Sequence, residues 1–236
     1  MKQLELVYQD EHLAVINKPS GLLVHRSRIA SGAREFAMQM LRNQLGRHVY
    51  PVHRLDRPTS GLLIFALNSD IARTLTEQLT AREVRKTYHA VVRGYVAESG
   101  TIDYALKEEL DKLADADADT DKEKQPAVTH YKCLKQVELS YKVSKKHDTT
   151  RYSLVQLQPE TGRKHQLRRH MAHIRHPIVG DTNHGDGRHN NFFREHFNCH
   201  RLLLAATGLS FKHPVSGESI NLEIPLPDEF HQPFLK

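Results

Sequence analysis

The chain has 236 residues, enough for one large domain or two small ones with a real hydrophobic core, so it does not need disulfide bonds for stability. Its 34 Lys and Arg residues against 28 Asp and Glu residues give a net charge of +6, which favours an anionic partner. The two cysteines, Cys133 and Cys199, match no metal-ligand or redox spacing, which excludes a disulfide-rich secreted scaffold. The longest apolar run, Leu62–Leu67, is too short to cross a membrane, and the amino terminus contains no signal-peptide core. We therefore expect a cytoplasmic protein that does not associate with membranes.

The charge is unevenly distributed along the chain. Residues 1–102 carry a net charge of +5, residues 103–123 carry −6 and residues 124–236 carry +7. The acidic part loses all apolar periodicity, so we interpret residues 107–125 as an exposed insertion. The alternative is that these residues mimic nucleic acid or repel RNAs that are not substrates. Because no internal repeat and no Gly/Ser linker marks a boundary, we expect a single domain over residues 1–236, without a separate nucleic-acid-binding domain.

Short apolar segments separated by turn signals predict strands and helices that are mixed along the chain without a βαβ rhythm. The expected strands span residues 4–8, 13–17, 61–67, 84–93, 127–138, 151–158, 208–212 and 219–224. The expected helices are residues 33–45 ending at Gly46, a segment capped at Asn68 or Ser69 with Ile71, Leu75 and Leu79 inward, and a segment after Gly162 with Leu167, Met171 and Ile174 inward. These elements predict an α+β fold around a largely antiparallel sheet.

The first stretch with candidate catalytic residues is VHRLDRPTSGLLIFA, residues 52–66. Asp56 stands between Arg54 and Arg57, ahead of a turn and a buried strand. Fixed positive charge beside a carboxyl group favours its ionised form, so Asp56 is suited to act as a nucleophile or base. The alternative is that Asp56 only pairs with an arginine and stabilises the turn.

The second stretch is REVRKTYHAVVR, residues 82–93. Strand alternation puts Lys86 and Tyr88 on the apolar face with Val84, Ala90 and Val92. Polar ends on such a face need partners, so the two side chains can line a pocket in which Tyr88 stacks on a base and its hydroxyl exchanges a proton. The alternative is ordinary packing of a strand tyrosine.

The third stretch, residues 160–181, begins with a turn and continues as a predicted helix crowded with cations: Arg163, Lys164, Arg168 and Arg169. Cations near a helix amino terminus oppose the helix dipole, so phosphates or a carboxylate are expected to compensate them. This pattern suits binding of an RNA backbone, together with an arginine turned towards a catalytic carboxylate.

Histidines in the same stretch raise the question of a metal site. His165, His170, His173 and His176 lack the spacing and the nearby Cys or acidic ligands of a zinc site, so solvated histidines are the favoured interpretation. The chain also lacks a GxGxxG motif, a P-loop and a GxSxG elbow, which removes support for a nucleotide cofactor or for serine hydrolysis. With Asp56 as the single well-marked carboxylate, a two-carboxylate glycosidase is disfavoured.

The three stretches closely resemble the ribosomal large subunit synthase A family of pseudouridine synthases. The resemblance rests on HRLDRPTSG, on RxVxKxY at Arg82–Tyr88 and on TGRKHQLRRH followed by HPIVGD, in that order and spacing, after an opening NKPSGLLVH. It covers residues 11–227 and implies the pseudouridine synthase fold, a mixed, mostly antiparallel central sheet with flanking helices and loops.

By this resemblance, Asp56 is the catalytic carboxylate, Arg168 pairs with it, and Tyr88 stacks on the flipped uracil and helps to remove the C5 proton. We expect substrate-binding roles for the remaining motif residues, Arg54, Arg57, Lys86, Arg163, Lys164, His165 and Arg169. Because substrate and product are isomers, neither a cofactor nor a metal is expected. Whether Asp56 attacks C1′, adds to the base or removes the C2′ proton stays open.

The acidic EELDK insertion, QPAVTHY and TTRYSLVQLQPETGRKHQLRRH are similar to the branch of this family that modifies uridine 65 of tRNA. We therefore expect tRNA as the partner of a monomeric enzyme, with ribosomal RNA as the alternative substrate. A non-catalytic RNA-binding protein would predict a damaged HRLD motif. A metal-dependent nuclease built on the His-rich residues 171–200 would lose its activity in chelator.

Overall fold

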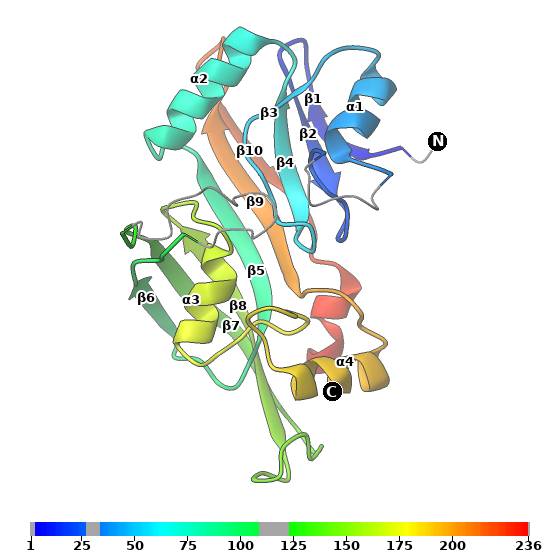
Figure 1. The fold of residues 1–236 in the computed structure, drawn as a ribbon, viewed down its shortest axis with the longest axis vertical. Coiled ribbons are helices and arrows are strands. Elements are labelled where there is room, and N and C mark those ends of the chain that lie inside the picture. The colour runs from blue at the N-terminus through cyan, green and yellow to red at the C-terminus, as the bar shows by residue number, and fades with distance from the viewer. Residues whose placement is uncertain (1–2, 27–33, 109–122, 236) are drawn as a thin grey trace. The chain divides into compact units, whose positions relative to one another are not determined.

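The computed structural model describes residues 3–26, 34–108 and 123–235 (Figure 1). Two compact units are distinguished, and each is assembled from separate parts of the chain. Of the described residues, unit 1 comprises 3–26, 34–86, 108, 123 and 206–224, and unit 2 comprises 87–107, 124–205 and 225–235. The expectation of one domain stays a prediction, and most of the predicted acidic insertion lies at residues 109–122, outside the described residues. Within the described ranges, no helix is long and apolar enough to cross a membrane.

Four α-helices and ten strands are described. The strands are β1 (Glu5–Gln9), β2 (Leu13–Lys18), β3 (Tyr50–Pro51), β4 (Ser60–Ala66), β5 (Arg85–Arg93), β6 (Ser99–Asp103), β7 (Val128–Leu139), β8 (Thr150–Pro159), β9 (Leu204–Lys212) and β10 (Ser219–Glu223). The helices are α1 (Ala37–Leu45), α2 (Ser69–Thr80), α3 (Gln166–His173) and α4 (Gly187–Phe197), followed by the short 3-10 helices Asp228–Phe230 and Gln232–Phe234. The strand order is β1-β2-β4-β9-β5-β8-β7-β6, with β10 on β9 and β3 on β4. The predicted α+β fold with a mostly antiparallel sheet is confirmed.

The core of unit 1 forms where β2 and β4 meet helix α2 (Figure 1). Every residue of β4 is buried, which explains why its sequence SGLLIFA is apolar almost throughout. Helix α2 places Ile71 and Leu75 into this core at helical spacing. The Asn68 side chain accepts a hydrogen bond from the Ile71 N–H at 2.9 Å, so the predicted cap is confirmed and the helix begins where the sequence predicts.

The start of helix α1 was predicted too early. The apolar pattern predicts a helix over residues 33–45, but the structure has α1 at Ala37–Leu45, and Phe36 instead bridges to Leu23. Phe36 therefore fits the helical spacing while its backbone is extended. The predicted end is confirmed, because Gly46 terminates the helix in the left-handed conformation with a φ of 66°.

The core of unit 2 lies between β5, β8 and helix α4. Tyr152 is fully buried, and its ring packs edge-on against Phe193 of α4 with centroids 4.9 Å apart. The sequence interpretation missed α4, because its segment GRHNNFFREHF holds few apolar residues among many polar ones. It also missed β3 and β6, and it began β9 at residue 208, whereas the strand begins at Leu204.

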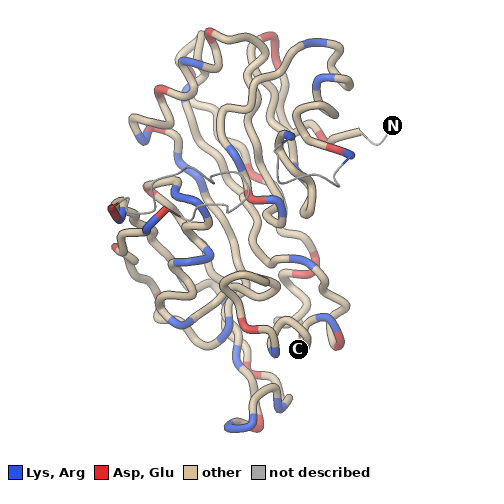
Figure 2. Tube along the Cα trace, in the orientation of Figure 1, with Lys and Arg blue, Asp and Glu red and all other residues tan. Residues whose placement is uncertain are grey.

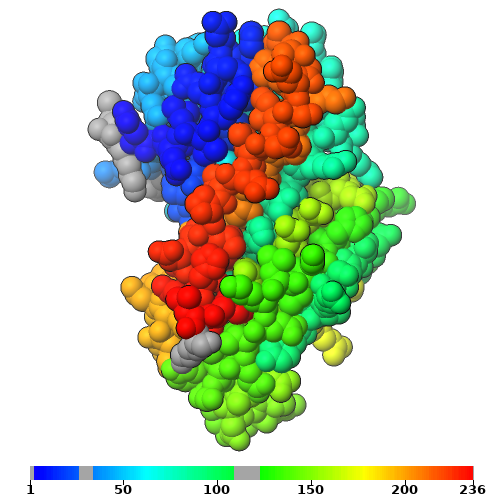
Figure 3. Space-filling model, turned by 180° about the vertical axis from the view of Figure 1, so that it is seen from behind, coloured from blue at the N-terminus to red at the C-terminus, as the bar shows by residue number. Residues whose placement is uncertain are grey.

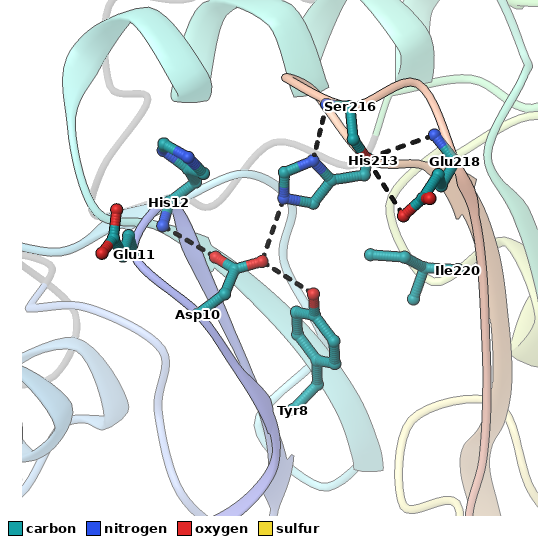
Figure 4. A pocket seen from close by; sticks show the side chains of 8 residues that line it. All are labelled: Tyr8, Asp10, Glu11, His12, His213, Ser216, Glu218 and Ile220. Atoms are coloured by element: carbon teal, nitrogen blue, oxygen red, sulfur yellow. Dashed lines mark hydrogen bonds and ion pairs between the residues drawn. The ribbon is translucent and has the colours of Figure 1, made fainter.

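A polar corner joins the β1–β2 turn of unit 1 to the turn between β9 and β10. Seen from behind, the blue β1–β2 residues lie beside the orange β9–β10 residues (Figure 3). Asp10 accepts hydrogen bonds from the Tyr8 hydroxyl at 2.7 Å and from Nε2 of His213 at 2.9 Å (Figure 4). It also accepts the backbone N–H groups of His12 and Leu13. The Asp10 carboxylate therefore links the two turns through these hydrogen bonds.

Candidate active site

Asp56 lies in the loop that leads into β4. Before Asp56, the buried side chain of Leu55 fixes the loop. After Asp56, the N–H of Thr59 donates to the Asp56 carbonyl at 3.0 Å. The Asp56 side chain itself is half-buried. Gly61 follows with a φ of +113°, and a Cβ at this position would lie 2.0 Å from the Ala206 carbonyl oxygen. Only glycine fits the backbone conformation and the contact there, which accounts for the PTSG turn.

Lys18 fastens this loop from within unit 1. Its side chain is fully buried, and its ammonium donates to the carbonyl oxygens of Pro19 at 2.9 Å, Leu22 at 2.8 Å and Arg57 at 3.2 Å. A buried ammonium needs such acceptors, since its burial would otherwise be costly. Lys18 thus ties the NKPSG turn to the residue that follows Asp56, a role that the sequence interpretation missed.

Three further hydrogen bonds join the same two segments. The Gly21 N–H donates to the Arg57 carbonyl at 2.8 Å, Nε of Arg57 donates to the Gly21 carbonyl at 3.0 Å, and the Ser20 hydroxyl donates to the Pro58 carbonyl at 2.6 Å. Arg57 was predicted to bind substrate, and the structure shows that part of its guanidinium also has this structural task. Its neighbour Arg54 is exposed.

His53 and Lys86 are two titratable side chains near this loop whose pKa values are lowered by burial. Nε2 of His53 accepts the Ile64 N–H at 3.3 Å, so the ring is neutral at that nitrogen. Burial, and then the charge of Lys86, lowers the pKa of His53 to about 3. Burial likewise lowers the pKa of Lys86 below its usual range. A half-buried cation on the apolar face of β5 suits the predicted substrate-binding role of Lys86.

Tyr88 lies in unit 2, on the part of β5 that pairs with β8. Its partner in the register is Leu157, and its side chain is 9% exposed. Val84, Tyr88, Ala90 and Val92 of the predicted apolar face are buried, and Lys86 is partly exposed. Val91 on the opposite face is buried as well, so both faces of this strand are covered.

Arg168 is held by a buried ion pair with Asp181. Its Nε donates to one carboxylate oxygen at 2.7 Å and its Nη2 donates to the other at 2.7 Å, while the exposed fractions of the two side chains are 4% and 0%. Burial alone would raise the pKa of Asp181, but the hydrogen bonds and charge of Arg168 outweigh it and hold the pKa below its usual value. This bidentate geometry fixes the plane of the guanidinium.

Asp181 is in turn held by its own surroundings. Its Oδ1 accepts the N–H groups of Asn183 at 2.9 Å and His184 at 3.0 Å, and its carbonyl accepts from the Asn190 side chain at 2.8 Å. The sequence interpretation quoted Asp181 within HPIVGD but assigned it no role. The predicted pairing of Arg168 with Asp56 stays a prediction. A guanidinium has five N–H donors, so Arg168 can hold Asp181 and a second carboxylate at once.

The cationic turn before α3 is organised by the buried side chain of Gln166. Its Oε1 accepts from the Thr161 hydroxyl and the Arg163 N–H, and its Nε2 donates to the Val128 carbonyl and the Thr129 hydroxyl. All its hydrogen-bonding groups are therefore engaged inside unit 2. The turn presents Arg163 and Lys164 as exposed side chains directly ahead of the helix.

The histidines of this segment have specific contacts. Nδ1 of His165 lies 3.1 Å from Nε2 of His184, His170 is buried between the Thr129 hydroxyl and the Tyr104 carbonyl, and the His173 ring stacks on Tyr104 at 3.7 Å. Arg169 donates to the Lys107 carbonyl at 2.9 Å. Among the residues that the structure describes, no group of three or more His, Cys, Asp or Glu side chains is placed to hold a metal ion.

Comparison with known proteins decides the family. The model of the RNA pseudouridylate synthase family matches residues 12–173. The chain belongs to the RNA pseudouridylate synthase family. The sequence prediction of an isomerase that forms pseudouridine in RNA is thereby confirmed.

Individual relatives support the assignment over nearly the whole chain. The chain is 58% identical over 219 residues to tRNA pseudouridine synthase C of Yersinia pestis, covering 93% of this chain and 85% of the relative. It is 54% identical over 234 residues to the protein of the same name from Vibrio parahaemolyticus, covering 99% and 95%. Human RNA Pseudouridylate Synthase Domain Containing 4 shares the fold with a TM-score of 0.71 at 26% identity, covering 97% of this chain and 92% of that one. The predicted pseudouridine synthase fold is confirmed.

Proposed function

We propose that this pseudouridine synthase acts on tRNA in the cytoplasm and converts uridine 65 of the tRNA to pseudouridine. The tRNA substrate is supported by the names of relatives that are 58% and 54% identical over 93% and 99% of the chain. The observation that carries the site assignment is the firmly held HRLD loop, in which Lys18 and three further hydrogen bonds fasten the residues beside Asp56.

The reaction breaks the bond between C1′ of the ribose and N1 of uracil, turns the base and joins C1′ to C5. The proton on C5 leaves and N1 gains one, so substrate and product have the same atoms and no oxidant, reductant or energy source is required. A uridine stacked in a helix must first leave the stack, which costs about a few kcal/mol. The enzyme therefore has to bind the flipped nucleotide firmly and exclude water from it.

In this proposal, Asp56 is the catalytic carboxylate and Arg168 is its partner. Asp181 holds the Arg168 guanidinium in one plane, so that the donors not used by Asp181 are oriented before the substrate arrives. Tyr88 offers its ring to the flipped uracil and helps to remove the C5 proton. The exposed cations Arg54, Arg57, Arg163 and Lys164 and the partly exposed Arg169 contact the phosphates and the displaced strand. Lys86 and His165 contact the nucleotide.

The test uses purified protein and tRNA transcripts that carry tritium at C5 of uridine. Each turnover releases the C5 tritium to water, so wild-type protein should release tritium from a transcript with uridine 65 and not from one with cytidine there. Asp56→Asn should reduce release below detection while RNA affinity stays within a few-fold. Asp70→Asn is the matched control, because Asp70 is an exposed residue of α2 that pairs with Arg73, and it should retain wild-type activity.

The other outcomes identify the alternatives. Release from a ribosomal RNA fragment but not from tRNA would keep the chemistry and replace the substrate. RNA binding without release from any transcript would favour a non-catalytic RNA-binding protein. Strand cleavage that a chelator abolishes would favour a metal-dependent nuclease. Light scattering during size-exclusion chromatography tests the expected monomer.

A further inference from the structure

The end of the β7–β8 hairpin is a strongly basic part of unit 2 that the proposed reaction does not use. Strands β7 and β8 reach past the other elements of unit 2, and Lys and Arg positions outnumber acidic ones at their end (Figures 1 and 2). The twenty residues 132–151 contain six Lys or Arg residues and two acidic ones, a net charge of +4 in a chain of +6. We call residues 140–149, which join the two strands, the hairpin tip.

Both acidic residues are already paired with neighbouring cations. Asp148 accepts from Lys142 at 2.7 Å, and Glu138 accepts from Arg151 at 3.2 Å. Lys145 and Lys146 at the turn are exposed, and neither forms an ion pair with any residue that the structure describes. The hairpin tip therefore presents two ammonium groups whose positive charge no local carboxylate neutralises.

The hairpin tip is anchored to the body of unit 2. The Tyr141 ring packs against Phe192 and His196 of α4, with centroids 5.1 and 4.7 Å apart. The Thr149 hydroxyl donates to Glu138 across the hairpin, and Ser144 forms a bridge with His147. These contacts order the backbone of the turn that carries Lys145 and Lys146, so a ligand that binds the two side chains loses little of its binding free energy to ordering that backbone.

Strand β8 sets the distance from the hairpin tip to the site region of unit 2. At about 3.3 Å per residue, the ten residues of β8 span about 33 Å. The hairpin tip lies at one end of the strand, while the exposed Arg163 and Lys164 follow the other end. Tyr88 pairs with Leu157 near that second end. Unit 2 thus carries two cationic groups on the order of 30 Å apart, and Tyr88 pairs with β8 towards the end of the strand that leads to Arg163 and Lys164.

We propose that the hairpin tip is a second phosphate-binding surface for the substrate RNA, through Lys145 and Lys146, and that it makes the enzyme select RNAs long enough to span β8. The proposal rests on RNA being the substrate. A spacing of about 30 Å corresponds to roughly ten base pairs of a duplex, so a short stem-loop placed at Tyr88 cannot reach the hairpin tip, whereas a folded RNA with a longer helical arm can. Two phosphate contacts without base contacts add affinity and register, and they leave the choice of base to the site.

The test compares the affinities of one protein for a long and a short RNA. The probes are a full-length tRNA transcript and an isolated stem-loop of about seven base pairs with the target uridine. The variant is Lys145→Glu combined with Lys146→Glu. Its control is Arg42→Glu combined with Lys212→Glu, two exposed residues of unit 1 that give the same change in net charge. A third protein, Lys145→Arg combined with Lys146→Arg, keeps both charges.

In the hairpin-tip variant, the ratio of long-RNA affinity to short-RNA affinity should fall about tenfold. The salt dependence of its long-RNA affinity should fall by about 1.4 to 1.8 in log–log slope, as expected for two lost phosphate contacts. The control and the arginine variant should keep the wild-type ratio. An unchanged ratio in the hairpin-tip variant, or an equal loss in the control, would overturn the proposal.

Affinity and turnover separate this proposal from the proposed function. Affinity is measured without turnover, so the hairpin-tip result stands whether or not the wild-type protein releases tritium from this tRNA. If the wild-type protein shows no turnover but the affinity ratio of the hairpin-tip variant falls as predicted, the proposed substrate is contradicted and the role of the hairpin tip is supported. If the wild-type protein turns over normally but the affinity ratio of the variant is unchanged, the proposed substrate is supported and the role of the hairpin tip is contradicted.

Discussion

The two units hold the charged side chains of the proposed site in different ways. In unit 1, the loop of Asp56 is fixed mainly through its backbone, by the Lys18 ammonium and by main-chain bonds to Gly21. In unit 2, Arg168 is fixed through its own side chain by the buried carboxylate of Asp181. The difference predicts how each unit responds to substitution. A loop with several separate backbone hydrogen bonds should lose stability gradually as these bonds are removed, whereas the bidentate ion pair of Arg168 should be lost when Asp181 alone is replaced.

The largest effect is expected for Asp181→Ala, which removes the bidentate carboxylate from the buried Arg168 guanidinium. Breaking a buried ion pair from one side costs about 3–5 kcal/mol, and we expect this loss in the free energy of unfolding. Asp181→Asn keeps the shape and should lose less stability, but its amide cannot hold both guanidinium donors. Misplacing the reacting group by about 1 Å costs about 10²-fold in rate, so kcat should fall on that order.

Chemical denaturation and single-turnover rates on the tritiated tRNA measure these two effects. Asp228→Asn serves as control, because Asp228 belongs to unit 2 and lies in a short 3-10 helix away from α3 in the sequence. If Asp181→Asn keeps the wild-type rate while folding normally, Asp181 does not orient Arg168 for catalysis.

A smaller effect is expected for Lys18→Met. Methionine has a similar length to lysine but lacks the ammonium that donates to three backbone carbonyls. Leaving buried acceptors without a donor costs about 1–3 kcal/mol, and the bonds from Gly21, Ser20 and Arg57 should hold the loop partly in place. The rate should fall with little change in RNA affinity, because Lys18 lies buried beneath the loop.

Lys212→Met is the matched control for this substitution, since Lys212 is an exposed residue of unit 1. Denaturation midpoints and the separate kcat and KM values measure the outcome. A loss of stability in Lys18→Met as large as that in Asp181→Ala would remove the distinction between the two kinds of support.

The last comparison concerns acid pH and one histidine in each unit. Burial lowers the pKa of His53 in unit 1 to about 3 and that of His189 in unit 2 to about 4. Both are neutral in the folded protein, so each contributes stability that is fully present above the ordinary histidine pKa near 6.5 and is lost as the pH falls towards the folded value. Thermal melting between pH 7 and pH 4 should show this decline.

Replacing either histidine by glutamine removes its titration. We expect His53→Gln and His189→Gln each to make the decline shallower than in the wild type. A wild-type melting temperature that rises as the pH falls from 6.5 to 4 would contradict the assignment of two buried neutral histidines.

Local pattern accounts for what the sequence predicted. The apolar alternation of β5 placed Tyr88 correctly, the caps at Asn68 and Gly46 fixed ends of two helices, and the motif around Asp56 marked a loop before a buried strand. Each of these depends on residues within a few positions of one another.

The missed features depend on residues that are distant in sequence. Asp181 meets Arg168 across 13 positions, through a segment without regular periodicity. Lys18 reaches Arg57 across 39 positions, and a lysine in a sequence gives no sign that it will be fully buried. Helix α4 is held by the packing of Phe192 and Phe193 on Tyr152, which local propensity does not express.

The most direct test of the central claim is a map of pseudouridine at single-nucleotide resolution in the RNA of cells that carry either the intact gene or Asp56→Asn. The account predicts that pseudouridine at position 65 of tRNA is present with the intact gene and absent with Asp56→Asn, while other positions stay unchanged. Pseudouridine at that position in both cell lines, or the loss of a ribosomal RNA site instead, would contradict it.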